Sequence, residues 1–229
     1  RGGPPELAGG DFGAEARRLG TMTARLHVAL AEAFGTRPGD PASWARLAAS
    51  RLEEAGGDEL PDARDLLGSV AESTDAGASI RVHGDYHLGR VMRVEFGWYV
   101  VDLEGEPFRP FEERRPVQSP LRDVAGMLRS FHYASSFAAR ERSPRERQNL
   151  AGLPEAWERR NREAFLEGYL GAPGVGDLLP SQPSSFDLVL AVFELDKAAQ
   201  ELAFERVFRP WRAQVPRRAL ERLLADPSY

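Results

Sequence analysis

Apolar side chains recur three or four residues apart over most of this 229-residue chain, which is the spacing of an amphipathic helix. The clearest run covers residues 14–34 and stops at Gly35. The same pattern predicts further helices over residues 44–55, 61–73, 121–140, 156–170, 186–208 and 216–224. Residues 80–106 are the exception, because Val91–Val94 and Trp98–Val101 flank a turn at Gly97 and predict a β-hairpin.

Composition narrows the class of protein. Apolar residues make up 42% of the chain and charged residues 28%, as in an ordinary soluble domain. The net charge is −5, and no basic stripe is interleaved with aromatic residues, so we expect no nucleic-acid partner. The chain has no cysteine and no apolar run near the ~20 residues that span a membrane. We therefore expect a cytoplasmic protein without a membrane partner.

Two aspartates are placed for joint chemistry. Asp85 follows a short apolar strand in the segment His83-Gly84-Asp85-Tyr86-His87, where a glycine permits a sharp turn. Asp102 comes seventeen residues later, at the far end of the hairpin. Because a hairpin brings its two ends together, both carboxylates can lie at its open end. Such a pair suits phosphoryl transfer, with Asp85 accepting a hydroxyl proton and Asp102 holding a divalent cation on nucleotide phosphates.

These segments resemble a known family. Residues His83–Arg90 are similar to the catalytic loop of aminoglycoside-phosphotransferase-like kinases. Residues Asp102–Pro107 and Ser119–Ala134 resemble the metal-binding segment and the following helix of actinobacterial maltokinases. The resemblance implies a fold that is mainly α with a small β-hairpin, as the C-terminal lobe of a protein-kinase-like, α+β two-lobe kinase. Residues 1–12 would then be a linker or cut point and residues 13–229 the catalytic lobe, with the N-terminal nucleotide lobe absent from this chain.

The resemblance also implies roles for single residues. Asp85 would be the catalytic base, Asp102 a ligand of Mg²⁺ and Glu104 a second metal ligand or a group behind the first. Asp123 would hydrogen-bond the catalytic loop, although a helix macrodipole alone also favours a carboxylate at a helix start.

Three further residues of the loop leave alternatives open. His83 would order the loop rather than carry protons, whereas His87 is either catalytic or structural. Arg90 stands where the family has asparagine or glutamine, and a guanidinium cannot ligate a cation because it carries only N–H donors. Either one metal ion suffices, or Arg90 replaces the second ion as a clamp on phosphate, or the site is impaired.

A second candidate site lies far along the chain. Glu194, Lys197 and Glu201 share one helical face, which by itself is typical of a solvated ladder of salt bridges. The segment and the following Arg209-Pro210-Trp211 resemble the part of maltokinases that lines the sugar pocket. Glu201 and Lys197 would then contact sugar hydroxyls, and Trp211 would stack on a pyranose face.

Together these features predict an ATP- and Mg²⁺-dependent sugar kinase. The resemblance favours a maltokinase that converts ATP and maltose to ADP and maltose 1-phosphate, with a trehalose synthase as partner or fusion. The alternatives are a glucosamine kinase of the same superfamily and a non-catalytic kinase-like domain, which Arg90 favours. Without a nucleotide lobe, we expect this chain by itself to be inactive.

Overall fold

The computed structural model describes residues 10–56, 63–103, 105, 117–140 and 152–225. The α-helices are α1 Gly13–Phe34, α2 Pro41–Glu54, α3 Arg64–Ala71, α4 Leu121–Arg140, α6 Leu153–Leu170, α7 Pro183–Phe208 and α8 Gln214–Ala225. Short 3₁₀ helices are η3 Leu88–Arg90, η5 Val175–Leu178 and η6 Pro210–Arg212. The strands are β1 Thr36–Pro38, β2 Ala78–Arg81, β3 Val91–Val94, β4 Gly97–Val100 and β5 Val117–Gln118. None of the described helices is both long and apolar enough to cross a membrane.

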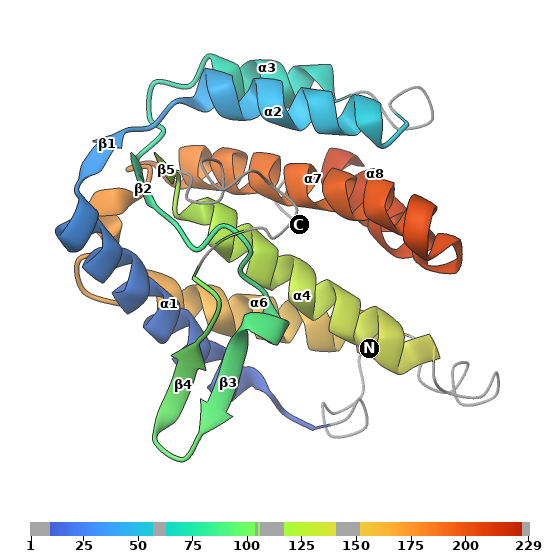
Figure 1. Ribbon diagram of the computed structural model, residues 1–229, viewed down its shortest axis with the longest axis horizontal. Coiled ribbons are helices and arrows are strands. Elements are labelled where there is room, and N and C mark those ends of the chain that lie inside the picture. The colour runs from blue at the N-terminus through green and yellow to red at the C-terminus, as the bar shows by residue number, and fades with distance from the viewer. Residues whose placement is uncertain (1–9, 57–62, 104, 106–116, 141–151, 226–229) are drawn as a thin grey trace.

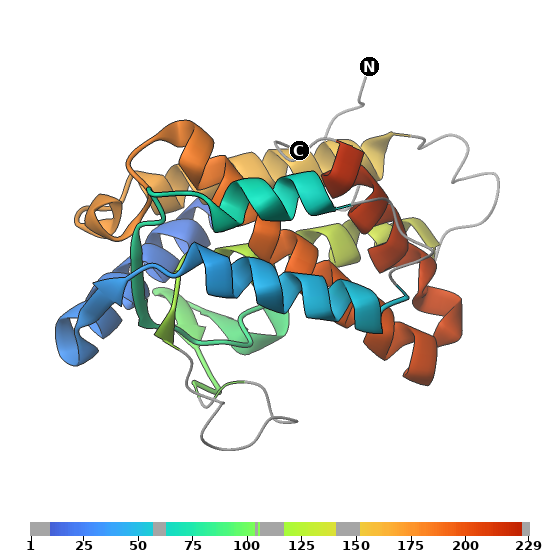
Figure 2. The ribbon, with the colours of Figure 1, turned by 90° about the horizontal axis from the view of Figure 1, so that it is seen from above.

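Helix α7 is the centre of the helical body. It packs against α2 and α3 on one side and against α4 and α8 on the others. Helix α4 packs in turn against α6, and α6 packs against α1 (Figure 1). Figure 2 shows α2 and α3 lying next to each other across α7. The buried apolar residues of α7 lie on more than one face, as suits a helix that is packed on several sides. Its buried apolar residues are Val189, Leu190, Ala191, Val192, Phe193, Leu195, Ala198, Ala199 and Leu202.

Two small antiparallel sheets lead the chain into its polar loop. In the first, β2 lies between β1 and β5, with Ile80 opposite both Thr36 and Gln118. In the second, β3 and β4 form the predicted hairpin, with Val91 opposite Val100. Since β2 runs into His83 and β5 into α4, the three-stranded sheet places the loop after β2 beside the start of α4.

The predicted helical body and its hairpin are present, but the sequence did not predict the three-stranded sheet beside them. Strands β1 and β5 are three and two residues long, which is too short to show an alternating pattern. Strand β1 also ends at Pro38, a residue that normally argues against a strand. Only pairing with β2 reveals them as strands.

Helices α1 and α6 approach each other at two glycines. A Cβ atom added at Gly20 would lie 2.0 Å from the carbonyl oxygen of Phe165, and one at Gly168 would lie 2.0 Å from that of Arg17. The two backbones are therefore in direct contact, which leaves no room for a side chain at either position.

We expect Gly20→Ala to lower the free energy of unfolding by about 2–3 kcal/mol, because the added methyl group must push two helix backbones apart. Chemical denaturation measures this loss. Gly68→Ala is the matched control, since a Cβ at Gly68 in α3 would have no atom within 4 Å. Alanine has the higher helix propensity, so the control variant should gain up to about 1 kcal/mol. Equal stability of the Gly20→Ala variant and the parent would contradict the close approach.

Candidate active site

The polar loop after β2 is held by Asp123 in the first turn of α4. Its Oδ2 accepts hydrogen bonds from the backbone N–H of His83 at 2.7 Å and from Nε2 of His27 at 3.1 Å, and its Oδ1 accepts from the N–H of Gly84 at 2.9 Å. Burial raises the pKa of Asp123, but the hydrogen bond and charge of His27, with His83 and the Gly84 N–H, outweigh it and lower the pKa. This buried carboxylate is therefore ionised and fixes the loop.

Further contacts join the loop to the helices and to the hairpin. The buried Tyr86 hydroxyl hydrogen-bonds Thr23 at 2.8 Å, and the N–H of Leu88 donates to Oγ of Ser130 at 2.9 Å. A Cβ at Gly126 would lie 2.4 Å from the carbonyl oxygen of Tyr86, so only glycine lets α4 come this close. Because Nε2 of His83 donates to the carbonyl of Val101 at 2.9 Å, the loop is also tied to the residue before Asp102.

A cavity of about 490 Å³ lies over this loop, between α4 and the C-terminal half of α7. Asp85 and Arg90 lie in it next to each other, and Glu201 lines it from α7. Its lining residues are Asp85, His87, Arg90, Gly126, Ser130, Tyr133, Lys197, Gln200, Glu201, Phe204, Glu205 and Arg209. Residues more than a hundred positions apart in the sequence thus share one cavity.

Asp85 is surrounded by basic side chains. Its Oδ2 lies 2.8 Å from Nη2 of Arg90 and 3.7 Å from Nε2 of His87, and its Oδ1 lies 3.7 Å from Nζ of Lys197. Burial raises the pKa of Asp85, but His87, the charge of Lys197 and the hydrogen bond from Arg90 together bring that pKa well below its ordinary value. The carboxylate is therefore deprotonated at neutral pH, as a proton acceptor must be.

Asp102 adopts a backbone conformation that side chains seldom take. Its φ of +60° is the one positive value among the described residues other than glycine, and its half-exposed carboxylate forms an ion pair with Nη1 of Arg90. Aspartate tolerates this left-handed conformation better than most residues, and such positions concentrate at functional sites.

The donor set at Asp102 is compatible with Mg²⁺. No group of three or more histidine, aspartate or glutamate side chains that could hold a metal occurs in the described part of the chain. Mg²⁺ is usually held by one or two carboxylates together with substrate phosphates and water, so a single exposed carboxylate fits it. Glu104, the predicted second ligand, lies outside the described residues, and both metal roles stay predictions.

Glu194, Lys197 and Glu201, which share one face of the predicted helix, lie in different environments in α7. Glu194 is buried and forms a two-point ion pair with Arg162 at 2.7 and 2.8 Å, so it does not line the cavity. Lys197 and Glu201 do line it, and Oε2 of Glu201 accepts hydrogen bonds from Nε and Nη2 of Arg129 at 3.1 and 2.8 Å. A solvated ladder is therefore not what these residues form.

Trp211 is 67% exposed in η6 and is not among the residues that line the cavity. The sequence did not single out Phe204 and Glu205 of α7, which also line the cavity. Arg129 was missed as well, and it is buried beneath Glu201. These residues carry no motif of their own, and only the packing of α4 against α7 brings them together.

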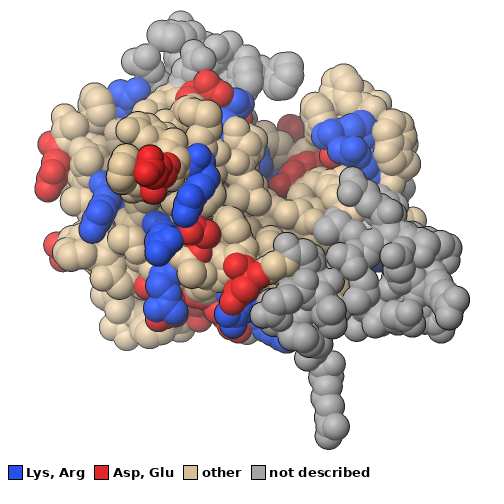
Figure 3. Space-filling view, turned by 90° about the horizontal axis from the view of Figure 1, so that it is seen from below, with Lys and Arg blue, Asp and Glu red and all other residues tan. Residues whose placement is uncertain are grey.

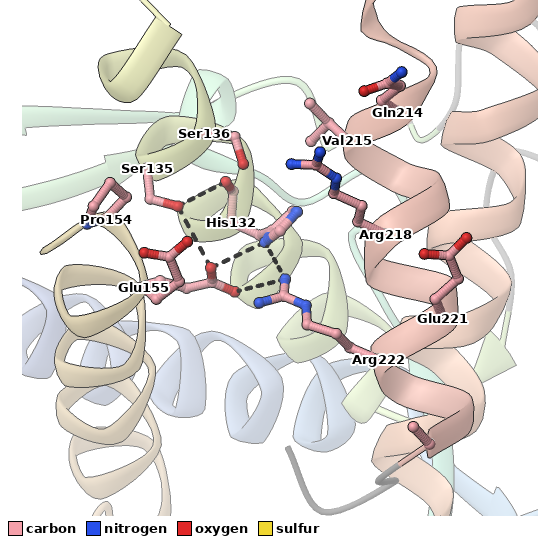
Figure 4. Close-up of a pocket in the computed structure, with 12 residues that line it drawn as sticks. His132, Ser135, Ser136, Pro154, Glu155, Gln214, Val215, Arg218, Glu221 and Arg222 are labelled. Atoms are coloured by element: carbon pink, nitrogen blue, oxygen red, sulfur yellow. Dashed lines mark hydrogen bonds and ion pairs between the residues drawn. The ribbon is translucent and has the colours of Figure 1, made fainter. Parts of the chain in front are cut away.

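A second cavity, of about 700 Å³, lies between α4, α6 and α8 (Figure 4). At its base Nδ1 of His132 lies 2.9 Å from Oε2 of Glu158 and 2.6 Å from Nη2 of Arg222. Figure 4 shows His132 and Arg222 turned toward each other rather than into the open space. None of the predicted catalytic residues lines this cavity, so it is not the candidate for the reaction.

Comparisons with known proteins identify relatives. No protein-family model matches the chain. It is 33% identical over 168 residues to a glucosamine kinase of Streptacidiphilus jiangxiensis, a match that covers 67% of this chain and 37% of that protein. It is 30% identical over 228 residues to a glucosamine kinase of Mycolicibacterium smegmatis, which covers 91% and 53%. Both relatives are named glucosamine kinase.

The solved structures agree with the sequences. A glucosamine kinase in complex with glucosamine, ADP and inorganic phosphate matches with a TM-score of 0.74 and 26% identity, over 92% of this chain and 54% of that one. A second crystal form of a glucosamine kinase matches equally well and is covered to 52%. The chain thus spans about half the length of the structures that it matches, and 37% and 53% of the two sequence relatives.

These matches correct the predicted fold. The described helices and sheets superpose on part of a glucosamine kinase, and the assignment to the C-terminal lobe of a two-lobe aminoglycoside-phosphotransferase-like kinase is wrong. That assignment depended mainly on short motifs at residues 83–90, 102–107 and 119–134, which determine local geometry but not the arrangement of helices around them. The preference for maltokinases over glucosamine kinases is likewise not supported by the relatives.

We expect Asp123→Asn to lower the free energy of unfolding by about 3 kcal/mol, because asparagine has one acceptor oxygen for the donors that two carboxylate oxygens now satisfy. Thermal and chemical denaturation measure the loss. Asp187→Asn, the same change at an exposed position of α7, is the control and should leave stability unchanged. A stable Asp123→Asn variant would show that the loop does not depend on this carboxylate.

Proposed function

We propose that this chain forms part of the active site of an ATP-dependent sugar kinase that phosphorylates glucosamine. The observation that carries the proposal is the ionised Asp85 carboxylate, held in a cavity by a loop that Asp123 anchors. The names of its relatives support the choice of reaction, and one related structure contains glucosamine, ADP and phosphate.

Asp85 and several charged groups around it have separate roles in the proposed reaction. Asp85 accepts the proton of the attacking sugar hydroxyl, which general-base catalysis requires to be within hydrogen-bond reach. Lys197 lies 3.7 Å from Asp85 and offsets negative charge on the transferred phosphoryl group. Asp102 would hold Mg²⁺, which supplies charge neutralisation on the nucleotide phosphates. Glu104 as a further ligand and His87 as a catalytic group belong to the same proposal.

Glu201 supports an amino sugar as the acceptor. Its Oε2 is engaged by Arg129, but within the described part of the chain its Oε1 accepts no hydrogen bond. A carboxylate oxygen that lines a cavity can receive the ammonium group of glucosamine, whereas maltose carries no cation for it. We further propose that Trp211, exposed beyond the end of α7, stacks on the sugar ring.

Two other functions are weaker. Maltose phosphorylation and a trehalose synthase partner find no support in the names of the relatives. A non-catalytic kinase-like domain is favoured by one observation, the ion pairs of Arg90 with both Asp85 and Asp102. Because a decayed site has no need to retain both carboxylates in one place, we favour the enzyme.

We expect the full-length protein to phosphorylate glucosamine in preference to glucose and maltose, since only the amino sugar offers a cation to Glu201. A coupled assay of ADP release with Mg-ATP and each sugar in turn measures kcat/KM. Asp85→Asn should lower kcat by about a thousandfold because the proton acceptor is lost. Asp177→Asn, at an exposed position of η5, should not change it. A parent protein that turns over none of the sugars would favour the non-catalytic domain.

Glu201→Gln should raise the KM for glucosamine by about tenfold, the size of one charge-assisted hydrogen bond. The KM for glucose, which has no amine, should change much less and serves as the internal control. Steady-state kinetics with both sugars measure the ratio, and the melting temperature checks that the loss of the pair with Arg129 leaves the fold intact. Equal effects on both sugars would show that Glu201 does not recognise the amine.

A further inference from the structure

The guanidinium of Arg90 lies between the two candidate carboxylates. Nη2 and Nε are 2.8 and 3.3 Å from Oδ2 of Asp85, and Nη1 pairs with Oδ2 of Asp102. The side chain of Arg90 is 22% exposed and lines the cavity. It therefore occupies the position that a divalent ion would need in order to touch both carboxylates.

The backbone holds Arg90 firmly in this place. Its N–H donates to the carbonyl of His87 at 2.8 Å, and its carbonyl accepts from the N–H of Val101 at 3.0 Å. Arg90 is thus fixed between the loop that carries Asp85 and the strand end that carries Asp102. From this position its side chain reaches both carboxylates.

We propose that Arg90 is a resident cation of this site, which keeps a divalent ion from bridging Asp85 and Asp102 and binds phosphate oxygens of the nucleotide directly. The inference rests on the proposed function, because a nucleotide is assumed as the anionic ligand. A guanidinium has five N–H donors and is always charged, so donors remain for a phosphate while others hold Asp85. Arginine forms two-point hydrogen bonds to phosphate as readily as to carboxylate.

The charges around the cavity support this assignment. The carboxylates of Asp85 and Asp102 are balanced by Arg90 and Lys197. Of the other acidic residues that line the cavity, Glu201 pairs with the buried Arg129 behind it and Glu205 pairs with Arg209. A balanced site attracts a free divalent cation weakly and does not repel a metal-free nucleotide.

Removal of the Arg90 charge should strengthen the binding of a free divalent cation and weaken the binding of a metal-free nucleotide. Without it, the described residues leave the two carboxylates facing Lys197 and the imidazole of His87, so a cation gains and an anion loses. We expect Arg90→Gln to bind Mn²⁺ about tenfold more tightly in the absence of nucleotide, and ADP in the presence of EDTA about tenfold more weakly. Electron paramagnetic resonance of free Mn²⁺ and titration calorimetry with ADP measure the two affinities on the full-length protein.

Two further variants make the test specific. Arg93→Gln removes an arginine from the same hairpin, where it pairs with Glu15 at the surface, and should change neither affinity. Arg90→Lys keeps the charge and should leave Mn²⁺ binding close to that of the parent. The melting temperature of each variant reports its fold independently of binding.

The proposal is overturned if Arg90→Gln leaves the Mn²⁺ affinity unchanged or lower, or leaves the ADP affinity in EDTA unchanged or higher. Neither measurement depends on the sugar. A protein that shows both expected shifts but phosphorylates no sugar would therefore refute the proposed function alone. A protein that phosphorylates glucosamine without these shifts would refute the role of Arg90 alone.

Discussion

The acceptance of three hydrogen bonds by the buried carboxylate of Asp123 is the interaction on which the candidate site depends. Its two oxygens take the backbone N–H groups of His83 and Gly84 and the imidazole of His27. A buried carboxylate with unsatisfied oxygens would be costly, so the loop and the helices α1 and α4 have to assemble around it together. The orientation of Asp85 follows from that assembly, since it comes directly after the two anchored residues.

Charged side chains around the cavity are paired as well. Glu201 is paired with Arg129, Glu205 with Arg209 and Asp85 with Arg90 and Lys197. Buried ion pairs contribute little net stability because desolvation opposes them, but removal of one partner leaves a charge that the interior does not tolerate. They therefore hold side chains in defined positions. On the face shown in Figure 3, charges of both signs are likewise interspersed, and no patch of one sign dominates it.

The local parts of the site could be predicted from the sequence. The hairpin, the loop and the approach of Asp85 to Asp102 depend on residues within about one hairpin of each other, as turn geometry dictates. The three-stranded sheet could not be predicted, because two of its strands are too short to carry a pattern. The pairs Arg129–Glu201 and Arg162–Glu194 could not be predicted either, since they join helices whose mutual arrangement only tertiary packing determines. The preference for maltose finds no support for a related reason, because the segments 102–107 and 119–134 on which it depended surround the transfer chemistry and do not select the acceptor.

The close approaches of backbone to backbone explain why the site tolerates a strained and charged loop at all. At Gly126 the carbonyl of Tyr86 sits where a side chain would otherwise be, so α4 presses directly on the loop. Helices α1 and α6, which meet without side chains between them at Gly20 and Gly168, hold His27 against Asp123 from the other side. Tight packing resists small displacements, because a shift of either helix would separate donors from the carboxylate oxygens that they satisfy. Asp102 depends on the same rigidity. Its left-handed backbone conformation is unfavourable, and such a conformation persists only where its surroundings hold it in place.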